Sequence, residues 1–123
     1  MPDTFDQARQ LFTQGIQAFE ASRFDEAERH FLDSLTHLPG RASTLLNLGA
    51  TRLRLGRPAE ALESLDQALA AEPSDRDAWC HHATALNELG RHEQAHASWQ
   101  RALALDASFA PAVFQDAITL NAL

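Results

Sequence analysis

The chain has 123 residues, which is about the size of one domain and enough to bury roughly two-thirds of its unfolded surface without disulfides or metals. Its 17 acidic residues against 10 basic ones give a formal charge of −7, with no basic run, and this balance argues against nucleic acid or an anionic membrane as a partner. The single cysteine, Cys80, cannot form an intramolecular disulfide, and no stretch approaches the roughly 18 uninterrupted apolar residues of a membrane span. Because the N-terminus also lacks the pattern of a signal peptide, we expect a cytoplasmic protein.

Seven helices are expected from the apolar periodicity and from residues that favour helix ends. The first begins at Thr4, which together with Gln7 has the spacing of a capping box, and it ends just before Ser22. Ser22 is then expected to cap a second helix that runs to about Leu38. The Pro-Gly dipeptide at 39–40 ends that helix, because proline cannot donate the next hydrogen bond and glycine tolerates a left-handed conformation.

The remaining five helices are delimited by the same kinds of residue. Gly56 ends the third, and Pro58 suits the first turn of the fourth, where a missing N–H is harmless. Ser74 is expected to cap the fifth helix and Ser108 the seventh. The expected ranges are about 41–55, 58–72, 75–89, 92–105 and 109–121. Helices of about 14 residues are marginal alone, so we expect them to be stabilised by stacking on one another.

A period of 34 residues runs through the chain. Ala61 lies 34 residues after Ala27 and 34 before Ala95, and the same spacing relates Leu69 to a leucine on either side. Self-similarity at this period indicates a solenoid with one supersecondary unit in each repeat. Small residues recur where helices should cross, and we expect them to serve packing rather than ligand binding. They are Gly15, Ala27, Gly49, Ala61, Ala68, Ala83, Ala95 and Ala102.

The repeat resembles the tetratricopeptide repeats, whose two-helix pattern contains an aromatic residue, Leu-Gly, Ala, a second aromatic residue and Pro. The middle copy matches with Leu48, Gly49, Ala61, Leu65, Ala68, Leu69 and Pro73. The outer copies match with Gly15, Phe24, Ala27, Phe31, Leu35 and Pro39, and with Trp79, Gly90, Ala95, Trp99, Ala102 and Leu103. The departures are Ser22 at a turn glycine, His82-Ala83 at Leu-Gly and Ala107 at the proline.

The resemblance covers residues 8–109 and implies an all-α fold, a right-handed α-solenoid. We expect a single domain over 1–123 with three antiparallel helix hairpins, followed by a C-terminal capping helix that makes seven helices in all. The hairpins are expected at about 8–41, 42–75 and 76–109, and the capping helix at 109–121.

Residues 92–96 read H-E-x-x-H, the helical motif of zinc proteases. The repeat register argues against this chemistry, because Ala95 inside the motif is the small packing residue of its repeat. A catalytic zinc also needs a third ligand in a cleft, for which only Asp106 and Asp116 are formally available beside His92 and His96. We therefore predict that the chain holds no metal and no cofactor.

Cys80 precedes His81 and His82, which resembles a thiol–imidazole pair on paper. Adjacent residues on a helix do not face each other, so the spacing does not provide a positioned base. The glycines are also too scattered for a phosphate-binding loop. We therefore predict that this chain is not an enzyme.

Tetratricopeptide arrays hold peptides or partner helices in a concave groove, and the resemblance implies that role here. One subclass clamps a C-terminal carboxylate with basic and asparagine side chains. Asn47 fits that set, but Phe12, Ile16, Asp77 and His81 stand where basic residues or asparagine would be expected. The sequence therefore disfavours a chaperone-tail adaptor.

Three functions stay open. The first is a stand-alone protein–protein interaction module with a scaffold or adaptor role, and the second is the N-terminal interaction domain of a longer protein, possibly an enzyme, with catalysis beyond Leu123. The third is homo-oligomeric assembly, for which we expect a monomer or a weak homodimer. Asp116 and Thr119 are expected where a following helix would pack, which suggests a solvated cap, whereas Leu120 and Leu123 leave the end apolar.

Residues that stacking does not require form a second face on the first helix of each repeat. This face is apolar in the first two repeats and polar in the third, so we expect a protein or peptide partner to place apolar groups on the former and polar groups on the latter. The candidate binding residues are Phe12, Ile16, Phe19, Leu46, Asn47, Ala50, Leu53, Arg54, His81, Thr84 and Glu88.

Overall fold

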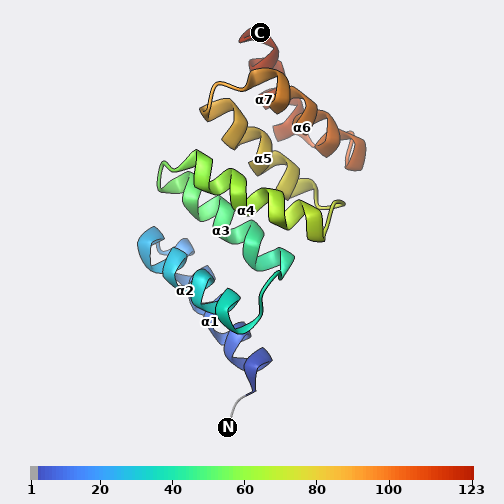
Figure 1. The fold of residues 1–123 in the computed structure, drawn as a ribbon. Helices are drawn as coiled ribbons and strands as arrows, with labels where there is room; N and C mark the ends of the chain where they lie inside the picture. Colours follow the sequence, from blue (N-terminus) through green and yellow to red (C-terminus); the bar gives the residue numbers. More distant parts are fainter. Residues whose placement is uncertain (1–2) are drawn as a thin grey trace.

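The computed structural model describes residues 3–123, which form seven helices and no strand (Figure 1). The helices are α1 (Thr4–Glu20), α2 (Phe24–His37), α3 (Ala42–Arg54), α4 (Pro58–Ala71), α5 (Arg76–Glu88), α6 (His92–Leu105) and α7 (Ala110–Asn121). The expectation of an all-α helical repeat with seven helices is confirmed. No helix in this described range is long and apolar enough to cross a membrane.

The helices pair as hairpins, and the hairpins stack. α1 packs on α2, α3 on α4 and α5 on α6, while α2, α4 and α6 each pack on the first helix of the following unit. Figure 1 shows this stack running from the N-terminal hairpin at one end to α7 at the other. Contacts between α1 and α3 and between α3 and α5 place the first helices next to one another. Their neighbouring faces therefore form one continuous row.

Small residues allow the two helices of a hairpin to cross closely. A Cβ added to Gly15 would lie 2.5 Å from the Phe31 ring, and one added to Gly49 would lie 2.6 Å from Leu65. The alanines of the same register are buried: Ala27, Ala61, Ala68, Ala83, Ala95 and Ala102. The expected packing role of these residues is confirmed. Since each crossing buries a large side chain against a small one, the hairpins gain their stability from this complementarity.

Aspartates, and not the expected hydroxyl residues, cap two of the helices. Asp3 precedes α1 and its carboxylate accepts a hydrogen bond from the Asp6 backbone N–H at 2.7 Å, so the capping box at Thr4 is wrong. Asp75 precedes α5 and accepts from the backbone N–H groups of Asp77 and Ala78, so a cap at Ser74 is wrong as well. In both cases the helix starts directly after the aspartate, which takes the N-cap position with an equally good acceptor.

The other two expected caps are also wrong. Ser22 has φ of 60° and occupies the left-handed position that Gly56 and Gly90 fill in the later repeats, while Arg23 precedes α2 without a side-chain cap. Ser108 donates its hydroxyl to Asp106, and α7 begins two residues later. Ser22 thus ends α1 and does not start α2.

A group of charged residues joins the first two hairpins. The Glu28 carboxylate of α2 accepts hydrogen bonds from Arg52 Nε and Arg57 Nη1, both at 3.0 Å, and Arg52 Nη1 also donates to Ser64 Oγ at 2.7 Å. The side chains of Glu28 and Arg52 are only 15% and 17% exposed. Burial alone would raise the pKa of Glu28, but the hydrogen bonds and charges of the two arginines together hold it below its ordinary value.

Glu28→Gln is expected to lower the free energy of unfolding by about 1–2 kcal/mol at neutral pH, because two charge-assisted hydrogen bonds become neutral ones. A carboxyl with a depressed pKa stabilises the fold above its unfolded pKa and loses that effect as pH falls through the folded pKa. The difference between the two proteins in urea unfolding should therefore shrink below about pH 4. If the two proteins differ in free energy of unfolding by the same amount at about pH 7 and pH 3, the charge of Glu28 is not the cause of its stabilising effect.

α7 packs on the body through polar residues. Asp116 is 5% exposed and accepts hydrogen bonds from His96 at 2.7 Å and Gln100 at 2.8 Å of α6. Thr119 is 1% exposed and accepts from Trp99 and Asn87. The expectation of a solvated cap formed by Asp116 and Thr119 is therefore wrong, because these residues are buried and pair with polar side chains of α5 and α6. The outer face of α7 is instead apolar, with Val113, Phe114, Ile118 and Leu120 exposed.

Candidate functional site

The predicted binding residues of the first two repeats lie on neighbouring faces of α1 and α3. Phe12, Ile16 and Phe19 are half-buried and pack against the cluster that contains Phe31 and Leu48. Leu46 and Leu53 are half-buried beside the cluster of Ala61, Leu65 and Ala85. These five side chains therefore serve inter-repeat packing and still present part of their surface to solvent.

Three further predicted residues of α3 differ in how much of them a partner can reach. Ala50 is buried at 9% exposure, so it belongs to the packing and not to the accessible face. Asn47 is half-buried, and its amide donates to the Ser43 carbonyl at 2.8 Å, which leaves its side-chain oxygen free of any protein partner in the described residues. Arg54 is exposed at the end of the helix.

In the third repeat the same face is hollow. Cys80, His81 and Thr84 of α5 line a cavity of about 210 Å³, whose other wall is Phe109 and Gln115 next to and on α7. An adjoining hollow of about 270 Å³ continues along α5 and α7, with Glu88 and Ile118 on its two sides. The two hollows share Thr84, Trp99 and Gln115. The structure thus brings His81, Thr84 and Glu88 together around one open groove.

The hollow follows from a change in side-chain size along the repeats. The first helices place Phe12 and Ile16, then Leu46 and Ala50, then Cys80 and Thr84 at equivalent positions. Side chains that fill the space between α1 and α3 are thus replaced by small ones between α5 and α7. Phe109 and Gln115 were not predicted as groove residues. The decrease in side-chain size at the equivalent positions of the first helices nevertheless indicated that α5 would leave space.

Two side chains inside the groove of the third repeat, His81 and Cys80, are uncharged at neutral pH. Burial lowers the pKa of His81, against the opposing effect of Asp77 and Asp75, so the imidazole is neutral at pH 7. Burial raises the pKa of the Cys80 thiol to about 11, and nearby Asp77 adds to this rise, so the sulfur is no nucleophile at pH 7. The part of the groove around Cys80 and His81 therefore suits neutral or apolar side chains, while Asp77 and Glu88 add two carboxylates to its lining.

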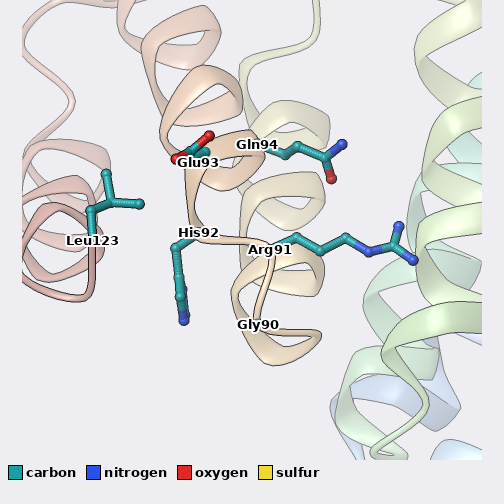
Figure 2. Close-up of a pocket in the computed structure, with 6 residues that line it drawn as sticks. All are labelled: Gly90, Arg91, His92, Glu93, Gln94 and Leu123. Atoms are coloured by element: carbon teal, nitrogen blue, oxygen red, sulfur yellow. The ribbon is translucent and has the colours of Figure 1, made fainter.

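The two histidines of the H-E-x-x-H segment take part in separate hydrogen bonds. His92 Nδ1 pairs with Asn87 Oδ1 at 2.9 Å, and His96 Nδ1 pairs with Asp116 Oδ1 at 2.7 Å. Figure 2 shows the His92 ring pointing away from the Glu93 carboxylate, beside an open hollow next to Leu123. Within residues 3–123 no three His, Cys, Asp or Glu side chains gather as metal ligands.

Asp106, the other formally available ligand, is held by an arginine. Arg76 Nη1 donates to its carboxylate at 2.8 Å, and this bond together with that from Ser108 lowers the pKa of Asp106. The Arg76 guanidinium also lies over the Phe109 ring, 3.8 Å from its centroid. These contacts fix the segment between α6 and α7 and so position Phe109 at the groove.

Comparisons with known proteins agree with the repeat architecture. A sequence model of the tetratricopeptide repeat family matches residues 18–83, and a second tetratricopeptide repeat model matches residues 77–109. The chain is 30% identical over 124 residues to "Tetratricopeptide repeat protein 36" of Danio rerio. The aligned region covers 98% of this chain and 65% of that protein. It is also 30% identical over 94 residues to "Hsp70-Hsp90 organizing protein" of Triticum aestivum, or 76% of this chain and 16% of that protein. The chain thus spans less than two-thirds of both relatives.

Solved structures share the fold at low sequence identity. The Arabidopsis OM64 TPR domain superposes with a TM-score of 0.95 at 18% identity, over 98% of this chain and 99% of that one. The first TPR of Spaghetti (RPAP3), solved with the HSP90 peptide SRMEEVD, superposes with a TM-score of 0.93 at 22% identity, over 96% and 94% of the two chains. At these identities the likeness concerns the fold.

Proposed function

Since the chain belongs to the tetratricopeptide repeat family, we propose that it is a protein-interaction module whose groove along α1, α3, α5 and α7 binds a segment of a partner protein. The observation that carries this proposal is the open groove between α5 and α7, with adjoining hollows of about 210 and 270 Å³. A hollow of this size accommodates one protruding side chain of a peptide. Peptide-binding grooves usually have an uncharged wall with apolar residues beside it.

Proteins of the same fold support this reading. The first TPR of Spaghetti is solved with an HSP90 peptide, and the second TPR domain of human RPAP3 with an HSP70 peptide. The Yersinia enterocolitica chaperone SycD is solved with a peptide of the translocator YopD. Each of these structures covers more than nine-tenths of this chain, so a peptide-binding role fits the whole array.

The predicted binding residues have different roles in this proposal. Phe12, Ile16, Phe19, Leu46 and Leu53 form the half-buried apolar floor of the first two repeats. The polar and charged positions provide directed contacts, and they are Asn47, Arg54, His81, Thr84 and Glu88. Phe109 and Gln115 join them as the opposite wall of the third-repeat groove.

The role is non-catalytic in this proposal and the protein is cytoplasmic, with residues 1–123 acting as one interaction unit. Both curated relatives are longer than the matched region, which supports the alternative that the chain is the N-terminal interaction domain of a longer protein, possibly an enzyme. Sequencing the full open reading frame would show whether the chain is a stand-alone interaction module or the N-terminal domain of a longer protein.

Paired substitutions test the groove. A peptide selected from a random display library should bind with an affinity that Phe12→Ala combined with Leu53→Ala lowers about tenfold or more, because its apolar floor is removed. Fluorescence anisotropy measures the affinity, and circular dichroism checks that helicity is retained.

Glu63→Ala combined with Gln67→Ala is the matched control, because both residues are exposed on the second helix α4. This pair is expected to leave the affinity unchanged. If the α4 pair abolishes binding and the groove pair spares it, the groove assignment is wrong.

Homo-oligomeric assembly is a second candidate function, and the outer face of α7 favours it. Phe114 is 65% exposed, and Val113, Ile118 and Leu120 are about half exposed, with no charged side chain exposed on this helix. An uncharged apolar face can meet a copy of itself without charge repulsion. We expect sedimentation velocity to show a monomer at about 10 µM and a weak dimer at about 500 µM, with Phe114→Glu monomeric at both. A dimer that tolerates Phe114→Glu would exclude this face.

A further inference from the structure

The two hollows that make up the groove of the third repeat share an apolar floor. Trp99 of α6 lines both hollows and is 3% exposed, so its ring is the floor between them. Phe109 adds an apolar wall to the hollow of about 210 Å³, and Ile118 adds one to the hollow of about 270 Å³. Each hollow can therefore receive one apolar side chain of a partner.

A carboxylate lies at each end of this groove. Asp77, in the first turn of α5, lines the smaller hollow, and Glu88, the last residue of the helix, lines the larger one. Both side chains are exposed, and they are separated by about three helical turns, or roughly 16 Å. Among residues 3–123 no arginine lines either hollow, and the sequence contains no lysine.

The charge of Asp77 is only partly balanced by its neighbour Arg76. Arg76 Nη2 lies 3.1 Å from Asp77 Oδ1, but Arg76 Nη1 lies 2.8 Å from Asp106 Oδ2. One positive charge is thus shared by two carboxylates, and this end of the groove keeps a net negative charge.

Glu88 has no ion pair in the part of the chain that the structure describes. Arg91 follows it by three residues but lines a different hollow, next to α4. Figure 2 shows the Arg91 side chain extending to the side opposite Leu123. The Glu88 carboxylate is therefore available to a charged group of a partner.

The wall opposite α5 offers no free charge. Asp116 is the only charged residue of α7, and it is buried and hydrogen-bonded to α6. An acidic segment in the groove would therefore meet only charges of its own sign. A basic side chain next to an apolar one would instead find Asp77 or Glu88 at the end of the hollow that the apolar group fills.

We propose that the groove of the third repeat binds a cationic segment of a partner protein, with an apolar side chain in each hollow and a lysine or arginine outside each that pairs with Asp77 or Glu88. This inference rests on the proposed function and names the chemistry of its partner. Lysine and arginine suit these positions because their alkyl stems cover apolar surface while the charged group stays in water. The chain's charge of −7 adds a long-range attraction for such a segment.

Peptides selected on the protein from a random display library provide the first test. They should carry an excess of lysine and arginine beside apolar residues. Replacing these basic residues by glutamine should weaken binding about tenfold at roughly 50 mM salt, and raising the salt to about 500 mM should remove most of the difference. Fluorescence anisotropy measures each affinity.

Asp77→Asn combined with Glu88→Gln removes the two groove charges with little change in side-chain size. This pair should weaken the basic peptides about fivefold or more at low salt and leave their glutamine versions nearly unchanged. Asp33→Asn combined with Glu63→Gln is the matched control, because both residues are exposed on the second helices α2 and α4 and the net charge changes equally. It should leave the affinity nearly unchanged, which separates the groove carboxylates from the overall charge.

Cys80→Phe combined with Thr84→Ile tests the hollows. It gives the third repeat the side chains that Phe12 and Ile16 provide at the equivalent positions of the first, and so fills the space between α5 and α7. The basic peptides should bind about tenfold or more weakly. Cys80→Ala combined with Thr84→Ser keeps the hollows open and should bind them normally, and circular dichroism checks that both variants keep their helicity.

The proposal is wrong if the selected peptides show no excess of basic residues, if the control pair on α2 and α4 weakens them as much as the α5 pair does, or if filling the hollows leaves their affinity unchanged. If the peptides in those cases still depend on Phe12 and Leu53, the groove function stands and only the cationic partner is excluded. If no selected peptide depends on groove residues, both proposals fail.

Discussion

Phe31→Ala is expected to lower the free energy of unfolding by about 3–5 kcal/mol, which is the range for a fully buried aromatic residue truncated to alanine. The Phe31 side chain is 0% exposed, fills the crossing at Gly15 and lies 5.8 Å from the Phe12 ring. It also packs in one cluster with Leu48 of the next hairpin. Its loss leaves a cavity within the first repeat and weakens the contact to the second. Urea unfolding followed by circular dichroism measures the change.

Phe114→Ala is the matched control for this substitution. The Phe114 side chain is 65% exposed on α7, so its truncation should change the free energy of unfolding by no more than about 0.5 kcal/mol. Similar effects of the two truncations would contradict this packing, because the stability of the first repeat would then not depend on Phe31 at the helix crossing.

Trp99→Ala is expected to have an effect of similar size, about 3–5 kcal/mol. The Trp99 side chain is 3% exposed in the core of the third repeat, and its Nε1 donates to Thr119 Oγ1 of α7 at 3.1 Å. The substitution therefore removes apolar packing and one of the bonds that hold α7. Hydrogen exchange should show faster exchange of the α7 amides than of the α1 amides in this variant.

Trp99→Phe separates packing from hydrogen bonding. It keeps an aromatic ring in the core but removes the indole N–H, so it should cost much less than the alanine variant, by about 2 kcal/mol or more. If α7 exchanges no faster in Trp99→Ala than in the unchanged protein, α7 does not depend on this contact.

The helices could be predicted from sequence because the same register occurs three times. Each repeat supports the assignment of the others, and the small residues at 15 and 49 mark the crossings independently of any helix propensity. The caps were less predictable. Aspartate and serine are nearly equal as N-cap residues, so neighbouring candidates such as Ser74 and Asp75 differ only in the backbone conformation that the fold imposes.

The candidate site was predicted in outline only. The face of the first helices follows from helical spacing, but Ala50 proved buried, because accessibility depends on the neighbouring helix and not on periodicity alone. Asp116 and Thr119 were misplaced since their partners, His96 and Trp99, come from 20 residues earlier in the chain.

Chemical-shift mapping by NMR shows most directly whether a peptide binds in the groove of the first helices. A display-selected peptide is titrated into the isotope-labelled protein, and the backbone amides that shift are located on the helices. If the groove binds the peptide, the largest changes are expected on α1, α3 and α5 around Phe12, Leu53 and Thr84, with the outer faces of α2, α4 and α6 little changed. Changes concentrated on α2, α4 and α6, with the groove amides unmoved, would contradict binding in the groove.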